Sequence, residues 1–126
     1  MNALLVQYNQ DGAYNEAANF LKLLANPNRL AVLCALHSES FNVTELTNLV
    51  GLPQAAMSTQ LAVLREAKLV DCEVNHRERR YYISDERVND MIELLYTFFC
   101  EETKAAIQAN KQVATNGHSL NGMQVD

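Results

Sequence analysis

The sequence predicts a mainly α-helical domain with one small β-hairpin, an α+β arrangement. Two observations predict it: apolar residues recur at helical spacing in several segments, and a single pair of short segments reads as strands. Of the 126 residues 48% are hydrophobic and 20% charged, as in an ordinary globular domain. We expect an N-terminal extension over residues 1–12, the domain over 13–104, and a disordered polar tail over 105–126.

Two helices open the predicted domain. Residues 13–25 place apolar side chains on one face at helical spacing: Ala17, Phe20, Leu21 and Leu24. Asn26 is a favourable N-cap residue, and Pro27 suits the first helical position because the N–H that proline lacks has no intrahelical partner there. The next helix is apolar nearly all round from Leu30 to Leu36, so we expect it in the middle of the domain.

A helix-turn-helix is predicted to follow. Asn42 and Glu45 have the spacing of a capping box ahead of a helix over about 43–50, and Gly51 supplies the left-handed conformation in which many helices end. Pro53 opens another helix almost at once, and a tight glycine-containing turn between two helices is typical of this motif. The apolar side chains of the second helix share one face: Met57, Leu61 and Leu64.

The opposite face of this second helix is small and polar. A helix of that shape fits the major groove of DNA, where short polar side chains hydrogen-bond base edges and Gln pairs with adenine. A merely solvated face is the alternative, and the helix-turn-helix context favours DNA contact. The candidate DNA-binding residues on this helix are Gln54, Ala55, Ser58, Thr59, Gln60 and Arg65.

A charged β-hairpin is predicted next. Residues 69–74 alternate, residues 80–84 are aromatic and β-branched, and the connection NHRER is polar and basic. A hairpin in this place is a wing, which makes the fold a winged helix-turn-helix. The net charge is −5, but residues 53–80 sum to +1. We expect Arg77 and Arg79 at the wing tip to contact phosphate or the minor groove, the alternative being a solubilising loop.

A long apolar helix closes the predicted domain. Ser84, Asp85 and Glu86 combine a cap with acidic groups in the first turn, where the helix dipole favours them. We expect a helix of about 20 residues, roughly 30 Å long. One face of this helix is too apolar to be exposed to solvent, so we expect it to pack against a partner helix. The residues of this apolar stripe are Val88, Met91, Ile92, Leu95, Phe98 and Phe99.

These elements resemble the ArsR/SmtB family of small dimeric bacterial repressors over about residues 15–102. The resemblance is carried by LANPNRLAVLCAL, by NVTELTNLVGLPQAAMSTQLAVLREAKLV and by RRYYIS. It implies that the extra helices at the two ends of the domain form a homodimer interface. Such a dimer binds a pseudo-palindromic operator in double-stranded DNA, with two recognition helices about 34 Å apart.

Three cysteines, Cys34, Cys72 and Cys100, do not make a secreted disulfide framework. Each taken alone is most simply a packing residue, and the apolar or acidic neighbours of Cys34 and Cys100 predict sluggish thiols. Their positions, however, resemble those of the persulfide- and redox-responsive subgroup of SqrR, BigR and HlyU, most of all HlyU. That resemblance implies a disulfide or polysulfide bridge that weakens operator binding, with reactive sulfur species or oxidants as inducers. It fits a repressor, and also a virulence regulator that activates by displacing a silencer.

Other functions have less support in the sequence. Neither usual metal site of the family is present: the helix before the recognition helix has no cysteine, and the last helix has Asp90 and Glu93 but no histidine. For that reason we expect no bound metal. We also expect no cofactor and no enzyme activity, because the sequence has no P-loop, dinucleotide motif or catalytic triad. No apolar run spans a membrane and no signal peptide is visible, so we expect a cytoplasmic protein. Two alternatives stay open: a metal sensor with an unusual site, and a regulator acting mainly through protein–protein contacts.

Overall fold

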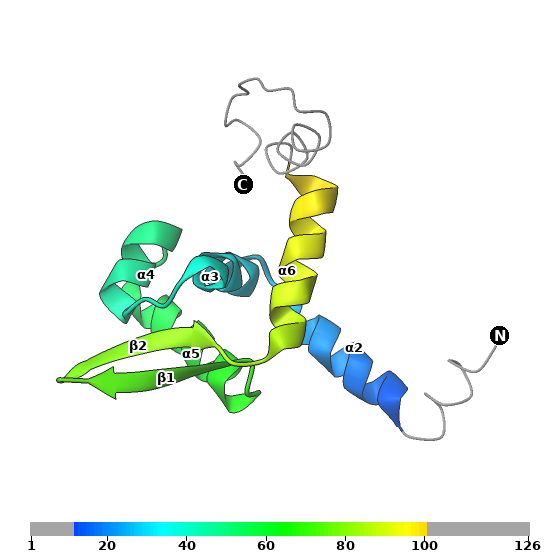
Figure 1. Ribbon diagram of the computed structural model, residues 1–126, viewed down its shortest axis with the longest axis horizontal. Coiled ribbons are helices and arrows are strands. Elements are labelled where there is room, and N and C mark those ends of the chain that lie inside the picture. The colour runs from blue at the N-terminus through cyan, green and yellow to red at the C-terminus, as the bar shows by residue number, and fades with distance from the viewer. Residues whose placement is uncertain (1–11, 101–126) are drawn as a thin grey trace. The chain divides into compact units, whose positions relative to one another are not determined.

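The computed structural model describes residues 12–100. Their elements follow in the order α2 (Ala13–Leu24), α3 (Pro27–Ser38), α4 (Val43–Val50), α5 (Gln54–Glu66), β1 (Val70–Asn75), β2 (Glu78–Ile83) and α6 (Glu86–Phe99) (Figure 1). The predicted helical fold with a β-hairpin wing is therefore confirmed. The chain divides into two compact units between Ser84 and Asp85. The expected extension before Gly12 and the expected tail after residue 104 fall outside the described residues.

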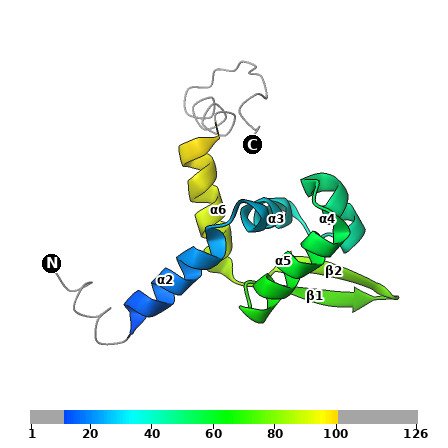
Figure 2. The ribbon, with the colours of Figure 1, turned by 180° about the vertical axis from the view of Figure 1, so that it is seen from behind.

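Helix α3 forms the centre of the first unit, as its apolar sequence predicts. It packs against α2, α4, α5 and β2, and Figure 2 shows α5 passing in front of the hairpin. The predicted apolar face of α5 is also buried in this core. The buried apolar residues of the first unit are Leu24, Val32, Leu33, Leu36, Leu46, Met57, Leu61, Leu64, Leu69 and Val70. This core fixes the two helices of the helix-turn-helix, α4 and α5, on one framework.

The predicted helix starts and stops are confirmed by their hydrogen bonds. The Asn26 side chain accepts from the backbone N–H groups of Asn28 and Arg29, at 2.9 and 3.0 Å. Asn42 and Glu45 form the reciprocal capping box at the start of α4. Gly51 ends α4 at φ 86°, a left-handed conformation that glycine adopts without steric cost. The sequence signals were sufficient here because each acts within a few residues.

Helix α5 ends in a left-handed residue that the sequence did not predict, because no glycine marks the position. Lys68 has φ 66°, its N–H donates to the Arg65 carbonyl at 2.9 Å, and the Leu69 N–H donates to the Leu64 carbonyl at 3.0 Å. This pair of bonds is the Schellman motif, whose left-handed position usually holds glycine. A lysine in that position turns the chain from α5 directly into β1.

The hairpin is tighter than predicted, so the expected loop over residues 75–79 is wrong. Strands β1 and β2 pair from Val70 opposite Ile83 to Asn75 opposite Glu78. Only His76 and Arg77 form the turn, both at positive φ (59° and 92°). Two successive left-handed residues are the feature of a type I′ turn, whose twist matches that of paired strands. Arg79 therefore lies within β2 and not in the connection.

Two apolar helices differ from expectation in detail. In α2, Leu24 is buried but Leu21 is 53% exposed, because Leu21 lies at the edge of the stripe that turns inward. Helix α6 has 14 residues rather than about 20, since Cys100 follows Phe99 in extended conformation (φ −108°, ψ 112°). Within α6, Val88 and Ile92 are buried, whereas Phe98 and Phe99 are 55% and 74% exposed.

Candidate nucleic-acid interface

The polar face of α5 is presented to solvent. Four of the predicted contact residues form one exposed group at its N-terminal end: Gln54, Ala55, Ser58 and Thr59. The Thr59 hydroxyl donates to the Ala55 carbonyl at 3.1 Å, which holds that side chain against its own helix. Because the other side of α5 is anchored in the core, this face is rigid. Its short side chains suit a helix that reads base edges in a major groove.

Gln60 differs from these four residues. It is half-buried, and its Oε1 accepts a hydrogen bond of 3.3 Å from Nη1 of Arg29 on α3. Arg29 also donates from Nε to the Leu23 carbonyl at 2.6 Å and from Nη2 to the Lys22 carbonyl at 3.3 Å. One guanidinium thus closes the end of α2 and holds the side of α5. Sequence reasoning missed this role, although an arginine in an otherwise apolar helix was the available signal.

Arg65 lies at the far end of α5 from the exposed polar group. Its Nε is 3.2 Å from the Asp71 carboxylate on β1, and the two side chains are 47% and 50% exposed. A pair this exposed contributes little to stability, because water and salt screen it. Arg65 thus joins α5 to the wing while its charge is offset by Asp71.

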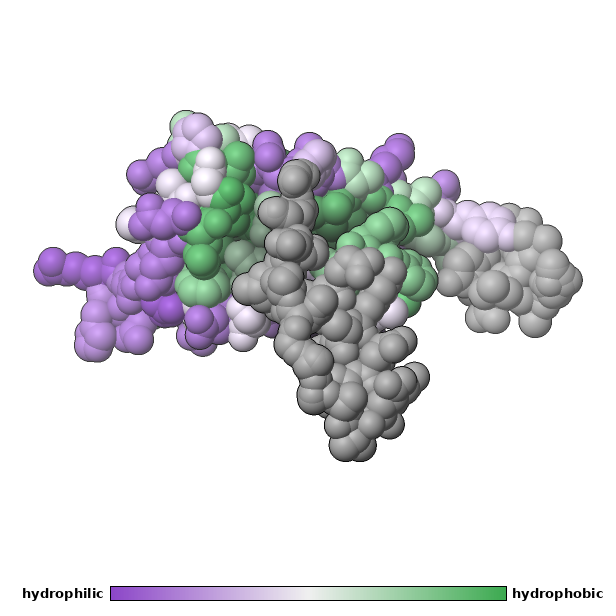
Figure 3. All heavy atoms as spheres, turned by 90° about the horizontal axis from the view of Figure 1, so that it is seen from above, coloured by the Kyte–Doolittle hydropathy of each residue, from purple (hydrophilic) through white to green (hydrophobic). Residues whose placement is uncertain are grey.

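The wing tip is the other predicted contact region. Arg77 and Arg79 are both exposed, and Arg79 Nη1 donates to Sγ of Cys72 at 3.4 Å. The end of the molecule that carries the hairpin tip is hydrophilic in Figure 3. Exposed guanidinium groups on a protruding hairpin can contact phosphate without moving the core. Arg77 lies in the turn itself and Arg79 is the second residue of β2, so both belong to the tip end of the hairpin.

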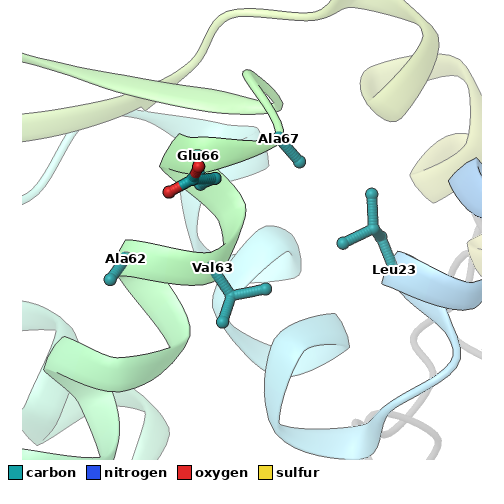
Figure 4. A pocket seen from close by; sticks show the side chains of 5 residues that line it. All are labelled: Leu23, Ala62, Val63, Glu66 and Ala67. Atoms are coloured by element: carbon teal, nitrogen blue, oxygen red, sulfur yellow. The ribbon is translucent and has the colours of Figure 1, made fainter.

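One shallow hollow of about 380 Å³ lies between α2 and α5. It is lined by Leu23, Ala62, Val63, Glu66 and Ala67, and Figure 4 shows Leu23 across from Val63 and Ala67. Its walls are almost wholly apolar and contain no thiol or imidazole. The hollow is therefore not a part of the candidate site.

The three cysteines occupy different elements and are not joined by disulfides. Cys34 lies on α3, Cys72 on β1, and Cys100 is the residue that ends α6; all three are half-buried. Among residues 12–100 no group of three or more His, Cys, Asp or Glu side chains is arranged to hold a metal ion. In the same residues, no helix has the length and apolar character needed to cross a membrane.

Comparison with known proteins identifies the arrangement. A helix-turn-helix domain family matches residues 24–73, which run from the end of α2 into β1. The biofilm growth-associated repressor of Xylella fastidiosa is 38% identical over 92 residues, covering 73% of this chain and 81% of that protein. This chain belongs to the ArsR/SmtB family. The matched residues include α4 and α5, the two helices of the helix-turn-helix.

Two further relatives define the type of ArsR/SmtB protein. The transcriptional activator HlyU of Vibrio cholerae is 37% identical over 86 residues, covering 68% of this chain and 80% of HlyU. The structure of reduced HlyU from Vibrio cholerae matches with a TM-score of 0.69 and 34% identity, over 75% of this chain and 99% of that chain. The chain is a DNA-binding transcriptional regulator of the HlyU type. These relatives are regulators and not enzymes, in keeping with the expected lack of catalysis.

Proposed function

We propose that this regulator is a cytoplasmic homodimer whose operator affinity is switched by a bridge between Cys34 and Cys100. The observation that carries the proposal is a half-buried thiol on α3 and another at the end of α6, in a chain that folds as a winged helix-turn-helix. A relative of similar fold is named for its reduced state, which supports a thiol-based switch. Half-buried thiols favour small inducers, such as reactive sulfur species or peroxide-sized oxidants, over bulky disulfides.

The chemistry of the bridge can be balanced for each inducer. Joining two thiols as a disulfide releases two protons and two electrons, which the oxidant accepts. A persulfide donor transfers a sulfur atom to one thiol, and attack by the second thiol then forms a disulfide with loss of hydrosulfide. Retaining the added sulfur in the bridge needs a two-electron oxidation instead. The mass of the bridged chain distinguishes these products.

The exposed face of α5 and the wing tip are the proposed DNA contacts. Gln54, Ala55, Ser58 and Thr59 would meet base edges, and Arg77 and Arg79 would meet phosphate. Arg65 would add a positive charge that Asp71 partly neutralises. Gln60 would lie at the edge of the contact surface, because its amide oxygen already accepts a hydrogen bond from Arg29.

Dimerisation is proposed through the exposed apolar side chains of the first and last described helices. Large exposed apolar groups mark interaction surfaces in small proteins. They are Tyr14 and Leu21 on α2, and Leu94, Phe98 and Phe99 on α6. Phe99→Glu, at a 74% exposed position, should leave the fold intact and convert the dimer to monomer in sedimentation equilibrium. An unchanged dimer would place the interface elsewhere.

Operator binding before and after bridging tests the switch. A duplex enriched by the reduced protein from a random pool serves as probe, and affinity is followed by fluorescence anisotropy. We expect exposure to a persulfide donor to weaken binding of the wild type and of Cys72→Ser, and to leave Cys34→Ser and Cys100→Ser unaffected. Loss of binding in all four proteins would assign the effect to another group. Unchanged binding in all four would contradict the proposed switch.

A further inference from the structure

Arg80 on β2 is the most highly bonded side chain of the wing. Its Nη2 donates to the Ser40 carbonyl at 2.7 Å and its Nε donates to the Ser40 hydroxyl at 3.2 Å. Its Nη1 donates to Glu78 at 3.2 Å, and Nη2 lies 3.4 Å from Glu45. All three guanidinium nitrogens are thus engaged, and the side chain is only 31% exposed.

Two of the partners of Arg80, Ser40 and Glu45, lie at the start of the helix-turn-helix, and the third, Glu78, lies on β2. Asn42 donates from Nδ2 to Glu78 at 2.6 Å, while its Oδ1 accepts from the Glu45 N–H at 2.8 Å in the capping box of α4. Beside them, Phe41 and Tyr81 exchange backbone hydrogen bonds of 3.2 and 2.8 Å. The wing is therefore fastened to the segment before α4 by side chains and backbone together.

The charge around Arg80 separates it from the two arginines at the wing tip. Two carboxylates, those of Glu45 and Glu78, lie within 4 Å of its nitrogens and offset its single positive charge. Arg77 and Arg79 are exposed at the tip instead. Four of the five N–H groups of this guanidinium face these acceptors, so Arg80 has no free pair of donors for bidentate binding of a phosphate.

We propose that Arg80 is a positioning residue that fixes the wing relative to the helix-turn-helix, so that the wing tip and α5 reach DNA together. The inference rests on the proposed phosphate contacts of the wing tip. A wing held in its binding position loses little conformational freedom on association, whereas a released wing must be ordered at that step. Arg80 acts through Arg77 and Arg79 and does not itself touch DNA.

The salt dependence of binding separates positioning from contact. Each phosphate contact contributes about 0.9 to the slope of log affinity against log salt concentration. With the duplex enriched by the wild type as probe, Arg80→Lys and Arg80→Gln should each lower affinity about tenfold, through the cost of ordering a released wing. Both should leave the slope at its wild-type value. Arg77→Gln, on the same hairpin, removes one phosphate contact from each protomer of the proposed dimer and should lower the slope by about 1.8.

For a second variant, positioning by Arg80 and simple electrostatics predict opposite changes in DNA affinity. Glu78→Ala removes a negative charge from a DNA-binding surface, which by itself strengthens binding to phosphate. It also removes the acceptor shared by Arg80 and Asn42. Positioning therefore predicts weaker binding by Glu78→Ala, with the circular dichroism spectrum of the wild type retained.

Each other outcome has a definite meaning. If Arg80→Lys binds like wild type while Arg80→Gln loses affinity and slope, Arg80 is a phosphate contact and the inference is overturned. It is overturned as well if Glu78→Ala binds more tightly. If Arg77→Gln keeps the wild-type slope, the proposed wing contact is wrong and the Arg80 inference falls with it. If the wild type enriches no duplex at all, the proposed operator reading fails.

Discussion

Nη1 of Arg29 on α3 lies 3.3 Å from Oε1 of Gln60 on α5, while Nε of the same guanidinium donates to the Leu23 carbonyl at 2.6 Å. A single side chain therefore ties α3 to the end of α2 and to the recognition helix. The planar fork of arginine is suited to this geometry, because its nitrogens point in fixed and different directions. Lysine has the same charge but cannot serve all these acceptors.

Arg29→Lys should destabilise the fold. Loss of the fork leaves the Leu23 carbonyl without its Arg29 donor and the Lys22 carbonyl with only the Ala25 N–H. We therefore expect a loss of about 1–2 kcal/mol in the free energy of unfolding. Urea denaturation measures it. Arg87→Lys is the matched control, since Arg87 is 69% exposed and an exposed ion pair is worth about 0–1 kcal/mol. Equal effects of the two substitutions would show that Arg29 has no special structural role.

Truncating the exposed face of α5 should reduce affinity without reducing stability. Alanine has a higher helix propensity than Gln or Ser, so Gln54→Ala and Ser58→Ala should leave the unfolding free energy equal or slightly higher. Each lost base contact should weaken specific binding by about 1–3 kcal/mol and affect random-sequence DNA little. Anisotropy titrations with both duplexes provide the measurement. Asn19→Ala, on the exposed face of α2, is the control, and equal losses in all three variants would contradict the proposed reading face.

Arg77→Gly should separate stability from DNA binding. Arg77 has φ 92° in the turn, and relieving a left-handed non-glycine residue gains about 1 kcal/mol. The same change removes a proposed phosphate contact. Lys68→Gly is a matched control, because it removes a positive charge at φ 66° at the end of α5. The melting temperature should rise for both variants. The slope of log operator affinity against log salt concentration should fall only for Arg77→Gly. A fall in neither would leave the wing tip without a DNA role.

Asp85, the N-cap of α6, should make the free energy of unfolding depend on pH in the acid range. The side-chain hydrogen bond from Arg87 lowers the pKa of Asp85 below its ordinary value of 3.8, opposed by partial burial and aided by the Arg87 N–H. A lowered folded-state pKa gives stability that is present above pH 3.8 and is lost as the pH falls below it. Asp85→Asn keeps a capping oxygen, so it should cost about 0.5 kcal/mol at pH 7. The difference between the two proteins should close in melts below pH 3.8; a constant difference would contradict this account.

The elements that the sequence predicts well are those governed by local chemistry. Asn26, the Asn42–Glu45 capping box and Gly51 act within one helical turn, so their outcomes could be read from spacing alone. The predicted wing turn is too long, because His76 and Arg77 stand where the Asn-Gly or Gly-Gly pairs that signal a type I′ turn would be expected. Lys68 likewise hides a helix end that glycine would have marked.

The candidate site divides in the same way. The exposed group of Gln54, Ala55, Ser58 and Thr59 follows from helical periodicity once the buried face is known. The Arg29 and Arg80 networks join residues 31 and 40 positions apart, and no local pattern states which of several cations will meet which acceptor. Tertiary packing decides those partners, so they emerged only with the structure.

The most direct test of the switch is the intact mass and peptide map of the reduced full-length chain after exposure to a small persulfide donor and, separately, to a thiol oxidant. The account predicts a cross-linked peptide joining Cys34 and Cys100, with Cys72 left as a thiol. The added mass of that peptide gives the number of sulfur atoms in the bridge. Recovery of both Cys34 and Cys100 as unmodified thiols from folded protein would contradict the proposed switch and leave both residues a packing role.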